Sequence, residues 1–172
     1  MFWQKNDEKL IRDGFRKILS KTFTLPNGQS QDFEIKKEGE VVCVVPITKD
    51  KKVILAKQFR PGPEKVFLEL PGGGMENGES PKEAMERELL EETGYTGNIE
   101  FVCSIPIGGY STGWRHVFTA TDCEKVDEQK LDETEFVEVV EVTLEDFRNH
   151  LQSGQLSDVH VGYLGLDYLK LL

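Results

Sequence analysis

The hydrophobic pattern divides the chain into short apolar runs and a few longer segments with helical signals. The nearly continuous apolar runs 40–47 (EVVCVVPI) and 53–59 (VILAKQF) are typical of buried strands. Asn27-Gly28, between two strand-like stretches, is a strong hairpin signal. The pattern predicts strands at 15–25, 31–37, 40–47, 53–59, 99–105, 115–120 and 136–142, and helices at 81–93, 144–152 and 158–172.

The helix that follows the glycine-rich turn 71–74 has clear ends in the sequence. Ser80 is a good N-cap, and Glu83 three residues later completes a capping box. Pro81 suits the first helical position, and Gly94 supplies the left-handed residue that commonly ends a helix. Glycines in the preceding turn also let the backbone approach a ligand closely.

This helix carries an unusual concentration of carboxylates on one face. Glu88, Glu91 and Glu92 fall within an arc of roughly 100°. Because they repel one another, the face is destabilising unless a cation neutralises it. A solvated acidic helix is the alternative, but the arc borders Met85 and Leu89 and therefore faces the body of the protein. Oxygen ligands without His or Cys suit Mg²⁺ or Mn²⁺.

The spacing of glycine, arginine and glutamate in this segment resembles the complete Nudix box. That family hydrolyses a nucleoside diphosphate linked to another moiety and uses divalent metal. Tyr95 departs from the pattern, because the family usually has an aliphatic residue there. The matching positions are Gly73, Glu79, Arg87-Glu88-Leu89, Glu91-Glu92 and Gly94.

The resemblance implies a metal site with Mg²⁺, or Mn²⁺, as cofactor. Glu88 and Glu92 are the expected core metal ligands, and the carbonyl of Gly72 is expected to reach a metal. Glu79 and Glu91 are further acidic positions that bind or support metal. Divalent ions can bridge these carboxylates and a pyrophosphate, polarise a phosphoryl oxygen and lower the pKa of a bound water.

Catalytic roles follow from the same resemblance. Arg87 is expected to orient Glu91 or Glu79 by ion pairing. The acidic loop before the strand 136–142 often supplies a glutamate that binds metal or acts as general base. Glu133 and Glu135 are the candidates, and Glu135 is preferred because it adjoins the strand.

Two segments before the box resemble the ADP-ribose and nucleotide-sugar branch of the family. In QFRP, Arg60 is expected to grip a substrate phosphate, although a surface salt bridge is the alternative. In ELPGG, Glu69 is expected to contact the ligand or a catalytic partner. Tyr110 can stack on a base or sugar, or simply pack. Typical ADP-ribose hydrolases carry a proline and an acidic residue in the loop around Tyr110, roughly where Gly108 and Gly113 stand here, and this departure leaves the exact substrate open.

We therefore expect an α/β/α sandwich of the Nudix type with a mixed central sheet over residues 38–172. Residues 1–37 should form an N-terminal antiparallel sheet extension, and in the branch that the chain resembles such an extension packs on a second subunit, which implies a homodimer. The expected activity is hydrolysis of the pyrophosphate of ADP-ribose or a related nucleotide sugar. The alternatives are a nucleoside triphosphate or dinucleoside polyphosphate hydrolase, or a non-catalytic nucleotide-sensing regulator.

Composition narrows the partners and the compartment. A chain of 172 residues suits one domain, and its net charge of −10 argues against binding nucleic acid or anionic membranes. The three cysteines have no metal-ligand spacing and are typical of reduced residues in a cytoplasmic protein. No stretch is long enough to span a bilayer.

Overall fold

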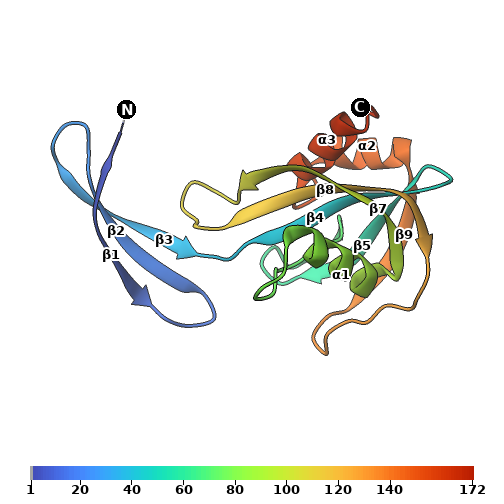
Figure 1. The fold of residues 1–172 in the computed structure, drawn as a ribbon, viewed down its shortest axis with the longest axis horizontal. Helices are drawn as coiled ribbons and strands as arrows, with labels where there is room; N and C mark the ends of the chain where they lie inside the picture. The colour runs from blue at the N-terminus through green and yellow to red at the C-terminus, as the bar shows by residue number, and fades with distance from the viewer. Residues whose placement is uncertain (1) are drawn as a thin grey trace. The chain divides into compact units, whose positions relative to one another are not determined.

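The computed structural model describes residues 2–172, which fall into two compact units. The first unit comprises residues up to Glu40 together with Ile105–Arg115, and the second comprises Val41–Ser104 together with His116–Leu172. Figure 1 shows the strands and helices of both units along the chain. Each unit is described in turn.

The first unit is built on a three-stranded antiparallel sheet in the order β1 (Gln4–Arg12), β2 (Lys17–Thr24) and β3 (Ser30–Lys37). The predicted Asn-Gly hairpin is present, with Gly28 at a φ of 82° in the turn between β2 and β3. Strand β1 was not predicted, because its sequence is mostly charged and polar and all nine of its residues are exposed.

Aromatic side chains gather on this sheet. The ring centroid of Phe33 lies 5.4 Å from that of Trp3, 6.0 Å from that of Phe23 and 6.4 Å from that of Tyr110. We call these four residues the aromatic cluster. They line a cavity of about 510 Å³, which Lys21 and Ser111 also border. A three-stranded sheet without a covering layer is marginally stable on its own, so this cluster provides much of its apolar packing.

The second unit contains a six-stranded sheet in the order β6-β5-β4-β8-β7, with β9 paired to β5. The pairing of β5 with β9 runs from Lys52↔Thr143 to Gln58↔Val137. The strands are β4 (Val41–Thr48), β5 (Lys52–Arg60), β6 (Lys65–Glu69), β7 (Tyr95–Pro106), β8 (Trp114–Lys125) and β9 (Val137–Thr143).

Helices cover both faces of this sheet, as Figure 1 shows. Helix α1 (Pro81–Thr93) packs its buried Met85 and Leu89 against one face. The apolar residues of that face are Val42, Val44, Ile54, Ile99, Phe118 and Ala120. Helices α2 (Leu144–Ser153) and α3 (Val159–Tyr168) lie on the other face.

Side-chain alternation explains the two layers. In strand β4, Val44 joins the cluster under α1, and the next residue, Val45, lies so close to Gly165 of α3 that a side chain on Gly165 would overlap it. Successive residues of a strand point to opposite faces, so β4 anchors both helical layers. Helix α2 packs on α3 in the same way, because Leu151 and Phe147 occupy the space beside Gly162.

The elements differ from the sequence predictions mainly in their lengths. Strand β6 was not predicted, while β7 and β8 each extend beyond the predicted runs 99–105 and 115–120. Helix α3 ends at Tyr168 rather than at the last residue. Within residues 2–172, none of the helices combines the length and the apolar character that crossing a bilayer demands.

Candidate active site

The ends of helix α1 are fixed by the residues that the sequence indicated. The Ser80 hydroxyl accepts a hydrogen bond from the Glu83 amide, and the Glu83 carboxylate accepts one from the Ser80 amide, which completes the capping box. Gly94 is left-handed, at a φ of 75°, and its amide donates to the carbonyl of Leu90. The helix therefore presents its carboxylates in a fixed register.

The acidic face of α1 meets a loop from a distant part of the chain in a small polar cavity. This cavity has a volume of about 170 Å³, and we call it the acidic cavity. Six carboxylates and two cations line it, and their charges sum to a marked local excess of negative charge. The lining residues are Glu76, Arg87, Glu88, Glu91, Glu92, Lys130, Asp132 and Glu135.

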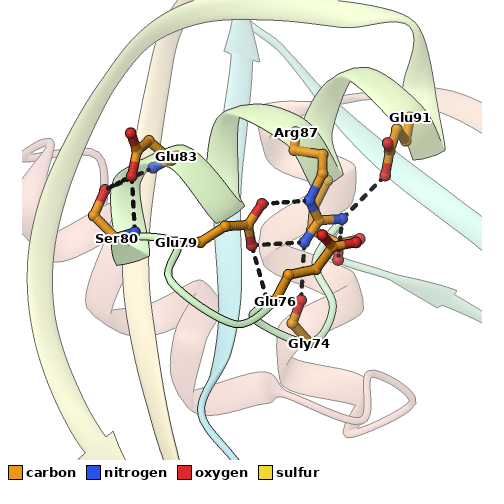
Figure 2. Close-up of polar contacts among 8 residues, drawn as sticks. Gly74, Glu76, Glu79, Ser80, Glu83, Arg87 and Glu91 are labelled. Carbon is orange, nitrogen blue, oxygen red and sulfur yellow. Dashed lines mark hydrogen bonds and ion pairs between the residues drawn. The ribbon is translucent and has the colours of Figure 1, made fainter.

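Arg87 ties the carboxylates of the helix and the glycine-rich turn together. Its Nε donates to Glu79 Oε1 at 2.7 Å, and its Nη1 donates to Glu88 Oε1 at 2.9 Å and to Glu91 Oε2 at 3.0 Å. Its Nη2 donates to the carbonyl of Gly74 at 3.0 Å. Figure 2 shows the guanidinium between Glu79 and Glu91. These carboxylates hold the pKa of Arg87 above its ordinary value, with Glu79 contributing most.

Glu92 lies at the most buried point of the acidic cavity. Only 7% of it is exposed, and its Oε2 accepts a hydrogen bond from the amide of Gly72 at 2.8 Å. The pKa of the Glu92 carboxyl is raised to about 8, chiefly by burial and also by the negative charges of Glu88 and Glu135, while the Gly72 amide and the charge of Arg60 oppose the shift. Burial also raises the pKa of Glu88, against the opposing effect of Arg87.

The glycine-rich turn passes directly beside these carboxylates. Gly73 exchanges two backbone hydrogen bonds with Val42, at 2.9 and 3.1 Å, which continues the sheet into the turn. A Cβ on Gly73 would overlap the carboxylate of Glu88, and a Cβ on Gly72 would overlap the backbone of Val42. The turn therefore needs glycine at both positions so that the backbone can reach the acidic cavity.

Arg60 and Glu69 form a separate pair near the end of strands β5 and β6. Arg60 Nε lies 2.6 Å from Glu69 Oε2, and the Glu69 side chain is 3% exposed while that of Arg60 is 47% exposed. Among the described residues, the other oxygen of Glu69 has no hydrogen-bond partner. Glu69 is therefore a buried partner of Arg60, whose side chain is about half exposed and whose charge also acts on Glu92.

The candidates outside the box fall into two groups. Glu135 lines the acidic cavity, whereas Glu133 does not. Tyr110 belongs to the first unit, where it is 64% exposed and lies beside Phe33 in the aromatic cluster. The structure thus brings Glu88, Glu91, Glu92, Arg87 and Glu135 together in one cavity.

Comparison with known protein families shows which group the chain belongs to. Residues 37–160 match the family described as the NUDIX domain. The chain belongs to the Nudix family. The match covers the acidic cavity, the glycine-rich turn and α1 entirely.

Related proteins match over most of their length. The chain is 39% identical over 150 residues to the "ADP-ribose pyrophosphatase" of Bacillus subtilis (strain 168), covering 86% of this chain and 80% of that protein. It is 35% identical over 167 residues to the "ADP-sugar pyrophosphatase" of Mus musculus, covering 85% and 76%. It is also 33% identical over 150 residues to the "Methanol dehydrogenase activator" of Bacillus methanolicus, covering 86% and 80%.

A solved structure shares the fold. The "ADP compounds hydrolase" superposes with a TM-score of 0.85, with 24% sequence identity and coverage of 99% of this chain and 95% of that one. The predicted fold class, an α/β protein with a mixed central sheet and an antiparallel extension, is confirmed. The prediction of a Nudix pyrophosphohydrolase is also confirmed, by the family match and the pyrophosphatase relatives.

Nudix enzymes use divalent metal, and the acidic cavity suits such an ion chemically. Its donors are carboxylate oxygens, and the raised pKa of Glu92 reflects a buried negative charge that a cation would stabilise. Within residues 2–172, no three His, Cys, Asp or Glu side chains converge as a formed metal site, and Arg87 donates hydrogen bonds to Glu79, Glu88 and Glu91.

Three residues of the acidic cavity were not identified from the sequence. Glu76, Lys130 and Asp132 line it alongside the Nudix box. Glu76 lies between the glycines of the Nudix box and Glu79. A carboxylate at this place in the sequence could have been identified as a candidate site residue. Lys130 and Asp132 belong to the acidic loop, which the sequence indicated only through its glutamates. Which residues of such a loop face a cavity depends on its folded path, and local pattern carries little information about it.

Proposed function

We propose that the protein hydrolyses the pyrophosphate bond of ADP-ribose or a related nucleotide sugar, with Mg²⁺ or Mn²⁺ as cofactor. The products would be a nucleoside monophosphate and a sugar phosphate. The observation that carries the proposal is the acidic cavity, in which the carboxylates of the Nudix box meet Glu135 of a distant loop. The printed names of the Bacillus subtilis and mouse relatives support the substrate class.

The box residues would divide the work of binding and positioning. Glu88 and Glu92 would hold the metal, with the carbonyl of Gly72 close by, since the Gly72 amide already contacts Glu92. Bound metal would neutralise the diphosphate, polarise a phosphoryl oxygen and acidify a water. Arg87 would keep Glu79 and Glu91 at the rim of the cavity through the ion pairs in Figure 2.

Glu135 is our candidate for the group that accepts a proton from the attacking water. It lines the acidic cavity opposite the helix, and its Oε2 accepts only a long hydrogen bond, of 3.4 Å, from the Asp132 amide. A carboxylate positioned beside a bound water can accept its proton. Glu133 was the other candidate, and its absence from the cavity lining favours Glu135.

Two further groups would contact the substrate. Arg60 would bind a phosphate with its half-exposed guanidinium, while the buried Glu69 holds its Nε in place. Tyr110 keeps its candidacy for stacking on a base or sugar, because its exposed ring borders a mostly apolar cavity of about 510 Å³ within the first unit. Both assignments keep the roles that the sequence indicated, except that Glu69 acts through Arg60.

A homodimer is part of the proposal. Residues 1–37 would serve as a dimerisation extension of the catalytic domain 38–172. The sheet β1-β2-β3 forms one layer, and Leu10, Ile11 and Phe15 expose 45%, 47% and 101% of their surface. A second subunit would cover such residues. Light scattering at several concentrations, compared with a variant lacking residues 1–12, tests this. A monomeric wild-type protein would contradict it.

We also place the protein in the cytoplasm. Among the described residues, Cys43, Cys103 and Cys123 form no disulfide, and two of them are buried, as expected where thiols stay reduced.

The activity is tested by incubating the purified protein and Mg²⁺ with ADP-ribose, several nucleotide sugars, a diadenosine polyphosphate and nucleoside triphosphates, and by identifying the products by chromatography. AMP and ribose phosphate from ADP-ribose, or the corresponding products from a nucleotide sugar, are the expected result. Pyrophosphate from triphosphates would favour the first alternative. Tight nucleotide binding without turnover would favour a regulator, a class in which the name of the Bacillus methanolicus relative falls.

A further inference from the structure

The loop that carries Glu135 is attached to the end of the box helix. We call residues 126–136 the acidic loop. Where it begins, the amides of Val126 and Asp127 both donate to the carbonyl of Gly94, at 2.9 and 3.2 Å. A Cβ on Gly94 would overlap the carbonyl oxygen of Asp127. Gly94 therefore ends the helix and also makes room for the loop against it.

The attachment continues along the last turn of α1. Carbonyl groups there have no partner within the helix and must find one elsewhere. The amide of Lys130 donates to the carbonyl of Glu91 at 2.8 Å. The side chain of Gln129 donates to the carbonyl of Glu92 at 2.6 Å. Two residues of the acidic loop thus satisfy two carbonyls of the metal-binding helix.

The side chain of Gln129 makes a second contact, with the start of β9. Its Nε2 also donates to the carbonyl of Val137 at 3.1 Å, where β9 begins. Both partners are acceptors, so only the amide nitrogen of glutamine can occupy this position, and a carboxylate oxygen there would face two carbonyl oxygens. Gln129 therefore joins the end of α1 to the start of β9. Glu135 lies in the segment between Gln129 and β9.

Little else holds the acidic loop. All of its residues are exposed except Gln129 and Leu131, which are half-buried. Few apolar contacts are therefore available to fix the path of the loop, and its hydrogen bonds to the helix end carry that task. Asp132 and Glu135, the two loop carboxylates of the acidic cavity, lie in the sequence between Gln129 and the start of β9.

We propose that Gln129 is a positioning residue, which holds the acidic loop on the end of α1 so that Asp132 and Glu135 face the metal-binding carboxylates. It acts through Glu135 and does not touch the substrate. This inference rests on the proposed function for its effect on turnover, but the attachment of the loop can be measured without substrate.

The first test measures the attachment directly. Gln129→Met keeps the size of the side chain and removes both hydrogen bonds, and Gln129→Glu adds repulsion. Gln152→Glu, on the exposed surface of α2, is the matched charge control. In hydrogen–deuterium exchange of metal-free protein, peptides covering 126–137 should exchange about tenfold faster or more in both Gln129 variants and unchanged in the control. Unchanged exchange in Gln129→Met would overturn the proposal, whether or not the wild type is an enzyme.

The second test asks whether the effect passes through Glu135. On the substrate that the wild type turns over, Gln129→Met should lower kcat about 10- to 100-fold with KM and melting temperature nearly unchanged. In a Glu135→Gln background, the same change should cost less than about twofold. Equal losses in the two backgrounds, or an unchanged kcat, would overturn the positioning role. A wild type that turns over nothing would refute the proposed function alone, and the exchange measurement would still decide the attachment.

Discussion

The acidic cavity has two sides that are built very differently. On the helix side, Glu88 and Glu92 are largely buried, and backbone or Arg87 donors fix them. On the loop side, Asp132 and Glu135 are exposed, and the position of the loop depends on a few hydrogen bonds. A rigid side suits the binding of an ion in one geometry. A weakly held side suits a group that must reach a water and then let the products leave. The difference predicts distinct consequences for changes on each side.

The largest effect is expected from removing a charge on the rigid side. Glu92→Gln should lower kcat by roughly 10³-fold or more, because losing a metal ligand forfeits several kcal/mol of charge stabilisation and each 1.4 kcal/mol is a factor of ten. The fold should persist, since an amide replaces a carboxyl that burial already keeps largely protonated. Steady-state kinetics measure the fall in kcat, and thermal melting measures whether the fold persists. Near-normal activity in this variant would contradict the assignment of Glu92 as a ligand.

On the loop side the expected loss is smaller and more selective. Glu135→Gln should lower kcat about 10²- to 10³-fold, within the range for a general base, with little change in metal affinity. Glu133→Gln is the matched control, because Glu133 lies in the same loop but outside the cavity lining. It should retain nearly full activity. If the two variants lost activity equally, or if Glu133→Gln lost more, the assignment of the base would move to Glu133.

A pair of glycine substitutions tests how closely the turn fits the rigid side. Gly73→Ala places a Cβ on the carboxylate of Glu88, whereas Gly74→Ala meets nothing within 4 Å. Because the Glu88 side chain can rotate aside, we expect a small change in melting temperature but a fall in kcat of about 100-fold from the displaced ligand. Gly74→Ala should behave nearly as wild type. Equal activities in the two variants would show that the turn tolerates a side chain.

The smallest expected effect is the pH dependence of Mg²⁺ binding. In the metal-free protein the pKa of Glu92 is about 8, so below that pH a metal must displace a proton from it. The apparent affinity for Mg²⁺ should therefore fall up to about tenfold for each unit of pH below 8 and level off above it. Calorimetry in buffers of different ionisation enthalpy should show proton release at pH 7. A pH-independent affinity without proton release would show that Glu92 is already ionised.

The rigid side could be predicted largely from the sequence. Ser80, Pro81 and Gly94 define α1 through local rules, and the helical period then puts Glu88, Glu91 and Glu92 on one face. Such signals act within a few residues, so no tertiary information is needed. The central strands were predictable for a similar reason, because buried runs such as β4 are apolar almost throughout.

The loop side could not be predicted in the same way. Gln129 contacts Glu92, 37 positions away in the sequence, and nothing in the run DEQKLDETE distinguishes it from its neighbours. Strand β1 was missed because exposed, charged residues make up most of it, and it forms only by pairing with β2. In both cases a contact with another segment of the chain determines the local structure, and the local sequence propensity contributes little.

The carbonyl of Gly94 accepts two hydrogen bonds, and this has a consequence for how the sequence can change during evolution. The chain leaves α1 at Gly94, runs through β7 and β8, and returns to the same carbonyl group at Val126 and Asp127. The hairpin formed by β7 and β8 therefore begins and ends beside the same residue, Gly94. Insertions or deletions at its far end, between Pro106 and Trp114, leave the distance between its two ends unchanged. Related sequences can thus remodel that tip, and with it the proposed substrate contact Tyr110, while the acidic cavity remains intact.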